Sequence, residues 1–194
     1  MTRDIRAGRI LVAALQQAIN EELPTRFEFY DHWLGPDGRR DGTLGMAPMA
    51  AVVGFLRTEG EGYHRVMAHA GALVAQWTWN DAGRWSRYWV PRLPRWWRIR
   101  STGRRLVAVI ADTCPATRAK ATVSSGVVTL SVRESVFCSA RERPVAPLCA
   151  FYAALLVAMF ASVDLVVAGQ MEECRARAER GTTCMGTFAV SSAP

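Results

Sequence analysis

Five cysteines carry the most specific chemistry in this sequence. They are Cys114, Cys138, Cys149, Cys174 and Cys184. No pair is spaced as Cys-x-x-Cys, so spacing alone does not define a metal site. The N-terminal stretch has no signal-peptide pattern, because polar residues interrupt its apolar run. We therefore expect a cytoplasmic, reducing location, where cysteines are buried small hydrophobes, metal ligands or reactive thiols more often than disulfides.

Histidines are the other candidates for metal chemistry. His64 and His69 lie five residues apart on a predicted helix and face different ways, and His32 lies in a predicted loop. One histidine could ligate the metal of a tetrapyrrole, but a lone helical histidine is more often a polar residue at the edge of a core. The sequence contains no Ser-His-Asp arrangement, paired carboxylates, dinucleotide fingerprint or phosphate-binding loop. It therefore favours a non-enzymatic role and leaves the question of catalysis open.

A basic, aromatic segment spans residues 84–105. It contains eight arginines and no acidic residue, in a chain whose formal charge is +7. Its aromatic residues are Trp85, Tyr88, Trp89, Trp96 and Trp97. The tryptophans could face the core beneath a solvated arginine face, or the segment could lie on an anionic membrane surface, with Arg95, Arg98 and Arg100 as the basic surface. Nucleic acid is the third interpretation and the one we favour least.

Hydrophobic periodicity predicts helices followed by strands. We expect helices at residues 5–19, 48–56, 63–77 and 96–110, a loop at 30–45 and a β-hairpin within 117–137. Residues 148–171 are long and apolar enough for a bilayer span of roughly 20 residues. However, Asp164 and its small, polar neighbours favour a helix over 147–160, a turn and a strand over 165–174. A last strand is predicted at 184–190.

This order of elements predicts an α+β fold, in which an antiparallel sheet packs against helices. The length fits a single domain over residues 1–194, with a mainly helical half at 1–110 and a sheet-containing half at 117–190.

The second half of the chain resembles the 4-vinyl-reductase domain family. The similarity consists of the run "PLCAFYAALL" at residues 147–156, a strand that ends in Cys174, a turn containing Gly181, and Cys184 followed by Phe188 and Val190. It covers roughly residues 117–190. The resemblance implies a fold similar to that of transport-protein-particle subunits and phenol-sensing domains, and members of the family often dimerise.

The resemblance also implies a metal site. Some sensing relatives hold zinc with three cysteines and a glutamate, which correspond here to Cys149, Cys174, Cys184 and Glu172. Glu172 would share a strand face with Cys174, and Glu173 is the rival ligand on the other face. Three thiolates and one carboxylate would form a closed, structural zinc site. On this basis, Cys114 and Cys138 lie outside the site.

The function that the resemblance implies is the binding of a bulky apolar or aromatic ligand. We expect a pocket between the N-terminal helices and the sheet, lined by Tyr63, Met67, Phe151 and Tyr152. The expected role is that of a carrier or accessory protein in bacteriochlorophyll or other tetrapyrrole synthesis, with a tetrapyrrole as ligand and a homodimer as the assembly. The alternatives are a hydrocarbon- or phenol-sensing module that acts through a partner, and a dimerising assembly protein.

Overall fold

The computed structural model describes residues 6–35, 42–138, 144, 146–177 and 182–192, with the side chains of residues 85 and 86 left aside. The helices are α1 (Arg9–Glu22), α2 (Phe27–Leu34), α3 (Met46–Arg57), α4 (Glu61–Asn80), α5 (Arg84–Trp89), α6 (Arg95–Thr113) and α7 (Ala150–Ala161). Short 3-10 turns are η1 (Pro24–Arg26), η3 (Val90–Arg92) and η4 (Val136–Cys138). The strands are β1 (Arg6–Ala7), β2 (Leu44–Gly45), β3 (Arg118–Ser124), β4 (Val127–Arg133), β5 (Leu165–Glu173) and β6 (Thr183–Ser192).

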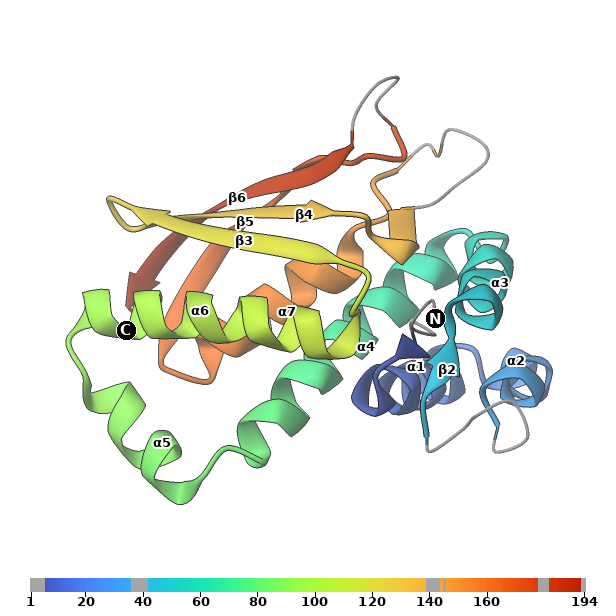
Figure 1. The fold of residues 1–194 in the computed structure, drawn as a ribbon, viewed down its shortest axis with the longest axis horizontal. Helices are drawn as coiled ribbons and strands as arrows, with labels where there is room; N and C mark the ends of the chain where they lie inside the picture. Colours follow the sequence, from blue (N-terminus) through green and yellow to red (C-terminus); the bar gives the residue numbers. More distant parts are fainter. Residues whose placement is uncertain (1–5, 36–41, 139–143, 145, 178–181, 193–194) are drawn as a thin grey trace, which may run out of the picture.

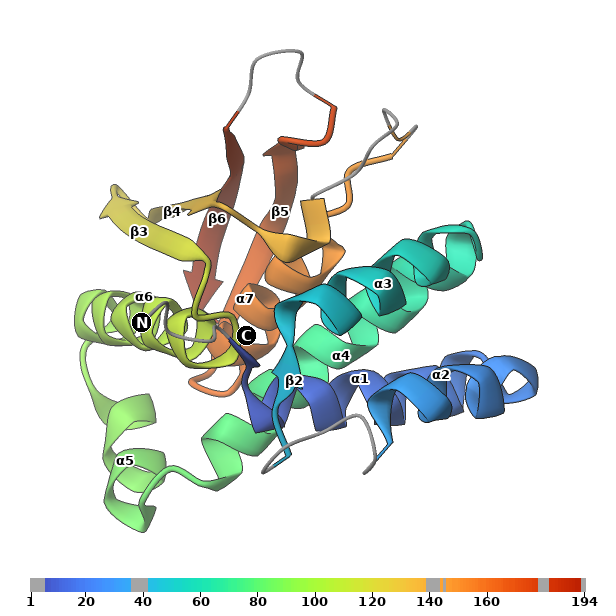
Figure 2. The same cartoon turned by 45° about the vertical axis from the view of Figure 1, so that its right-hand side comes forward.

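The main sheet is antiparallel, with strand order β3-β4-β6-β5. Helices α6 and α7 lie beneath it, and α4 and then α1 lie farther away (Figures 1 and 2). The predicted α+β class, with an antiparallel sheet packed against helices, is therefore confirmed. Strands β1 and β2 form a separate small pairing.

Helix α7 is the centre of the core. Its sequence is apolar on all sides, because one face packs on the sheet and another on α4. The crossing with α4 is close: a Cβ at Gly71 would collide with the carbonyl oxygen of Phe151 and lie 3.0 Å from the amide nitrogen of Leu155. Only glycine allows the two backbones this approach.

Two glycines, Gly169 and Gly186, make room for Phe188 in the sheet. Gly169 in β5 has a φ of 156°, and it pairs with Phe188 of β6. A Cβ on Gly186 would lie 2.9 Å from the Phe188 ring. The ring can therefore lie fully buried between the strands and the helices.

Most of the predicted elements are confirmed. Helix α7, a turn and β5 occupy the long apolar stretch, and none of the helices in the described part of the chain combines the length and apolarity of a membrane span. The loop predicted at residues 30–45 is wrong in its first part, because α2 continues to Leu34. Tyr30 and Leu34 are one helical turn apart and both are buried, which is the packing that stabilises this short helix. Residues 36–41 lie outside the described part.

A candidate metal centre of four cysteines

Four cysteines from four different elements meet at one end of the sheet. Cys138 ends η4, Cys149 directly precedes α7, Cys174 directly follows β5, and Cys184 is the second residue of β6. Their sulfur atoms all lie within 4.8 Å of one another, and all four residues are buried. The arrangement follows from the sheet, because the end of β5 and the start of β6 are neighbours in an antiparallel pair, and β6 also pairs with β4.

The sulfur–sulfur distances suit one tetrahedral metal ion. Cys138 Sγ lies 3.3 Å from the sulfurs of Cys149 and Cys184 and 3.8 Å from that of Cys174. A zinc ion bound at its usual Zn–S length in a tetrahedron separates its sulfurs by about 3.8 Å. These are free thiols and not disulfides. The centre could therefore hold a metal.

Backbone amides favour thiolate at two of the positions. The Leu148 N–H donates to Cys174 Sγ over 3.4 Å, and the Arg175 N–H donates to Cys184 Sγ over 3.3 Å. Hydrogen bonds from the neighbouring thiols, supported by these amides, lower the pKa of Cys174 and of Cys184. Hydrogen bonding within the cluster raises the pKa of Cys149. Four thiolates this close together would repel one another strongly. A bound metal ion would supply the positive charge that offsets this repulsion.

A buried polar network positions the two segments that carry Cys138 and Cys149. The Tyr63 hydroxyl donates to the carbonyl oxygen of Leu148 over 3.0 Å and lies 3.4 Å from that of Phe137. Arg57 Nη2 donates to the same Phe137 oxygen over 2.9 Å. Helices α3 and α4 thereby hold the backbone on both sides of the cluster.

The fourth residue of the cluster corrects the predicted ligand set. Glu172 is exposed and accepts a hydrogen bond from Thr187 Oγ1 at 3.2 Å, and the rival Glu173 is also exposed. A register irregularity between Met171 and Glu173 shifts the alternation of side chains, so Glu172 faces outward whereas Cys174 turns inward. Cys138, which was placed outside the site, takes the fourth position, and Cys114 lies apart at the end of α6.

The four predicted pocket residues lie in the packed core. Tyr63, Met67, Phe151 and Tyr152 are each at most 1% exposed. The rings of Phe151 and Tyr152 contact one another at 5.4 Å between centroids, and the Tyr152 hydroxyl donates to Ser135 Oγ over 2.9 Å. Two hollows in the described part of the chain, one beside Ala75 and Met159 and one beside Trp96 and Arg100, are lined by none of the four. The predicted ligand pocket stays a prediction.

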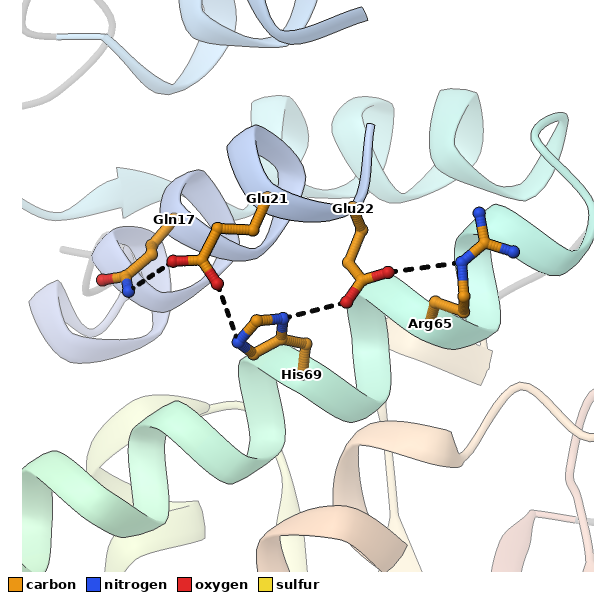
Figure 3. Close-up of polar contacts among 5 residues, drawn as sticks. All are labelled: Gln17, Glu21, Glu22, Arg65 and His69. Carbon is orange, nitrogen blue, oxygen red and sulfur yellow. Dashed lines mark hydrogen bonds and ion pairs between the residues drawn. The ribbon is translucent and has the colours of Figure 1, made fainter. Parts of the chain in front are cut away.

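The histidines do not meet one another or the cysteines. His32 is exposed, and His64 is partly buried with its ring against Tyr63. His69 has a structural role, since its Nε2 lies 3.2 Å from Glu21 and its Nδ1 lies 3.1 Å from Glu22 (Figure 3). Both ring nitrogens therefore face carboxylates of α1, which ties the end of that helix to α4.

The predicted basic surface divides into two parts. Arg98 donates to the carbonyl oxygen of Val163 over 2.9 Å, and Arg95 donates to that of Val190, so both help to join α6 to the sheet-containing half. Arg100 is exposed and lines a surface hollow of about 260 Å³. The other residues that line this hollow are Trp96, Trp97, Ser101 and Arg104.

Comparison with known proteins gives a likeness in structure only. No family model matches the sequence, and no curated protein matches it. A crystal structure of an H-NOX protein from S. oneidensis in the Fe(II)NO ligation state superposes with a TM-score of 0.55, over 95% of this chain and 99% of that one. A triple mutant of an H-NOX protein from S. oneidensis in the Fe(II) state gives 0.58, over 96% and 97%. Both are 9% identical to this chain.

The likeness shows an H-NOX-like fold. The predicted membership of the 4-vinyl-reductase family is wrong, because no family model supports it and the structural neighbours are H-NOX proteins. The short motifs that suggested that family, above all the run before and within α7, are the positions that pack this helix against α4 and the sheet.

Proposed function

We propose that this chain is a small-molecule-binding sensor domain with an H-NOX-like fold, stabilised by one zinc ion at Cys138, Cys149, Cys174 and Cys184. The observation that carries the zinc assignment is the approach of four buried sulfurs to within 4.8 Å of one another. Four thiolates in a tetrahedron are typical of zinc or of an iron–sulfur centre, and the 3.3–3.8 Å spacings around Cys138 suit a single ion.

The zinc would be structural. Four protein ligands complete a tetrahedral shell and leave no open position for water or substrate. The ion would join η4, the start of α7, the end of β5 and the start of β6, which are separated along the chain and held at one end of the sheet. Binding of the ion would displace the protons that the cysteine thiols still carry, so the affinity for zinc would fall in acid.

The sensor assignment is supported by the likeness in fold to proteins whose structures are described by an iron ligation state, in one case with NO bound. The tetrapyrrole predicted from the sequence stays a candidate ligand, but the structure does not assign a histidine to it. His69 has both nitrogens against carboxylates, His32 is exposed, and His64 lies against Tyr63 at the edge of the core. A role in bacteriochlorophyll synthesis depended on the rejected family and is not proposed.

Native purification without chelator tests both parts of this proposal. Elemental analysis is expected to give one zinc per chain, and native mass spectrometry with visible absorption identifies any co-purified small molecule. Detection of iron together with strong visible absorption would mean that the protein holds an iron centre and not zinc. A metal-free protein would refute the metal assignment. The homodimer remains a prediction, which sedimentation velocity measures directly.

A further inference from the structure

A second feature lies away from the cysteine centre, on α5 and the first turns of α6. We name it the Trp–Arg surface and define it by six exposed residues: Tyr88, Trp89, Trp96, Trp97, Arg100 and Arg104. Its four aromatic side chains are 48–60% exposed, which is unusual for such large apolar groups. In both views α5 projects from the body of the chain, at the end opposite the starts of β6 and the cysteine centre (Figures 1 and 2).

The charge of this region is not balanced by acids. Residues 84–105 hold eight arginines and no acidic residue. Several of these arginines donate hydrogen bonds to backbone carbonyls: Arg92 to Tyr88, Arg95 to Val190, Arg98 to Val163 and Arg105 to Thr78. Within the described residues, no carboxylate lies in ion-pair distance of an arginine of this segment. The positive field is therefore available to an anionic partner.

The hollow in the surface has the chemistry of a phosphate site. Arg100 and Arg104 are one helical turn apart, so both guanidinium groups reach the same face of α6. The indoles of Trp96 and Trp97, with centroids 5.0 Å apart, form its apolar wall. Guanidinium groups bind phosphate through paired hydrogen bonds, and tryptophan prefers the boundary between lipid headgroups and acyl chains.

We propose that the Trp–Arg surface docks on an anionic lipid bilayer. The aromatic residues would enter the headgroup layer, and Arg100 and Arg104 would bind lipid phosphate in the hollow. A bilayer fits better than nucleic acid, because single strands are bound along extended basic grooves, whereas these groups surround one compact hollow beside a projecting helix. Docking would leave the cysteine centre at the far end free of the lipid.

Vesicle sedimentation with the full, zinc-loaded chain tests this surface. We expect binding to phosphatidylcholine vesicles that contain phosphatidylserine, and little binding to phosphatidylcholine alone. Two arginines at about 1 kcal/mol each predict that the double variant Arg100→Gln and Arg104→Gln binds about 30-fold more weakly. Added salt is expected to weaken the wild type in the same way.

Matched variants separate lipid contact from loss of the fold. Arg118→Gln removes an exposed arginine on β3, outside the surface, and should bind almost as tightly as the wild type. Trp96→Ala should weaken binding while zinc content and thermal midpoint stay unchanged. Equal binding to neutral vesicles, no binding at low salt, an equal loss in Arg118→Gln, or tighter binding to a single-stranded oligonucleotide would each overturn the proposal. If the chain is metal-free after purification without chelator but still binds vesicles, that result would refute the zinc centre and leave the lipid proposal standing.

Discussion

Replacement of Cys138 by serine is the sharpest test of the cysteine centre. The hydroxyl of a serine is a poor zinc ligand, so the variant should lose stoichiometric zinc. Glu172→Gln, which changes the exposed residue predicted from the sequence, should keep it. Cys114→Ser is the matched control, because Cys114 and Cys138 are both 2% exposed and a buried serine perturbs both sites similarly.

The size of the effect follows from ligand linkage. A zinc concentration about 100-fold above the dissociation constant adds about 2.7 kcal/mol to the free energy of unfolding. For a chain of this length, about 1 kcal/mol moves the thermal midpoint by about 2–4 °C. Zinc removal should therefore lower the midpoint of the wild type by about 5–11 °C, and it should not change that of Cys138→Ser.

The assay is thermal unfolding with and without chelator, beside elemental analysis of each variant. Cys114→Ser should start from a lower midpoint but keep the full response to zinc. A wild type whose midpoint ignores zinc, or a Cys138→Ser variant that retains one zinc per chain, would refute the four-cysteine site.

Four further predictions concern the elements around the centre. Tyr63→Phe removes the hydroxyl that holds the segments beside two of the cysteines, and should lower the free energy of unfolding by about 1–3 kcal/mol in urea titration and weaken zinc binding. Gly71→Ala should destabilise by about 1–3 kcal/mol through the collision with α7, whereas Gly54→Ala, with open space around it, should stabilise slightly. Burial raises the pKa of Cys114 to about 12, so its contribution is complete below about pH 9 and is lost as pH rises towards 12; the alkaline fall in urea midpoint should be smaller in Cys114→Ala. His69→Gln should cost about 1 kcal/mol, because the link from α4 to α1 is only partly buried, and an unchanged urea midpoint would contradict that link.

The sequence predicts the elements well where their pattern is long. The helix that became α4 and the hairpin of β3 and β4 have clear periods of about four and of two, and both are confirmed. The short helix α2 was missed because its eight residues are followed by a segment rich in glycine, aspartate and proline. Its stability comes from packing against α1 and α3, which local pattern does not reveal.

The ligand set predicted from the sequence includes three of the four clustered cysteines and leaves out Cys138, for a reason that lies in the topology. Proximity of Cys174 and Cys184 follows from an antiparallel pair of consecutive strands. Cys138 comes close to these two cysteines only because β6 lies between β4 and β5. Hydrophobic periodicity does not predict the order of strands in a sheet. The position of Glu172 depended on strict alternation, which the irregularity in β5 breaks.

The packing of α4 on α7 limits where a small molecule can bind. Gly71 brings the two backbones into contact, and the predicted pocket residues Tyr63 and Phe151 are closed to solvent around that crossing. A zinc ion at Cys149 would fix the start of α7, so the helix could move away from α4 only at its other end. The small hollow between Ala75 and Met159 lies near the C-terminal ends of α4 and α7, whereas Cys149 lies at the N-terminus of α7. If zinc binds as proposed, a ligand that entered between these helices would open the core from this end, with the cysteine centre as the fixed point.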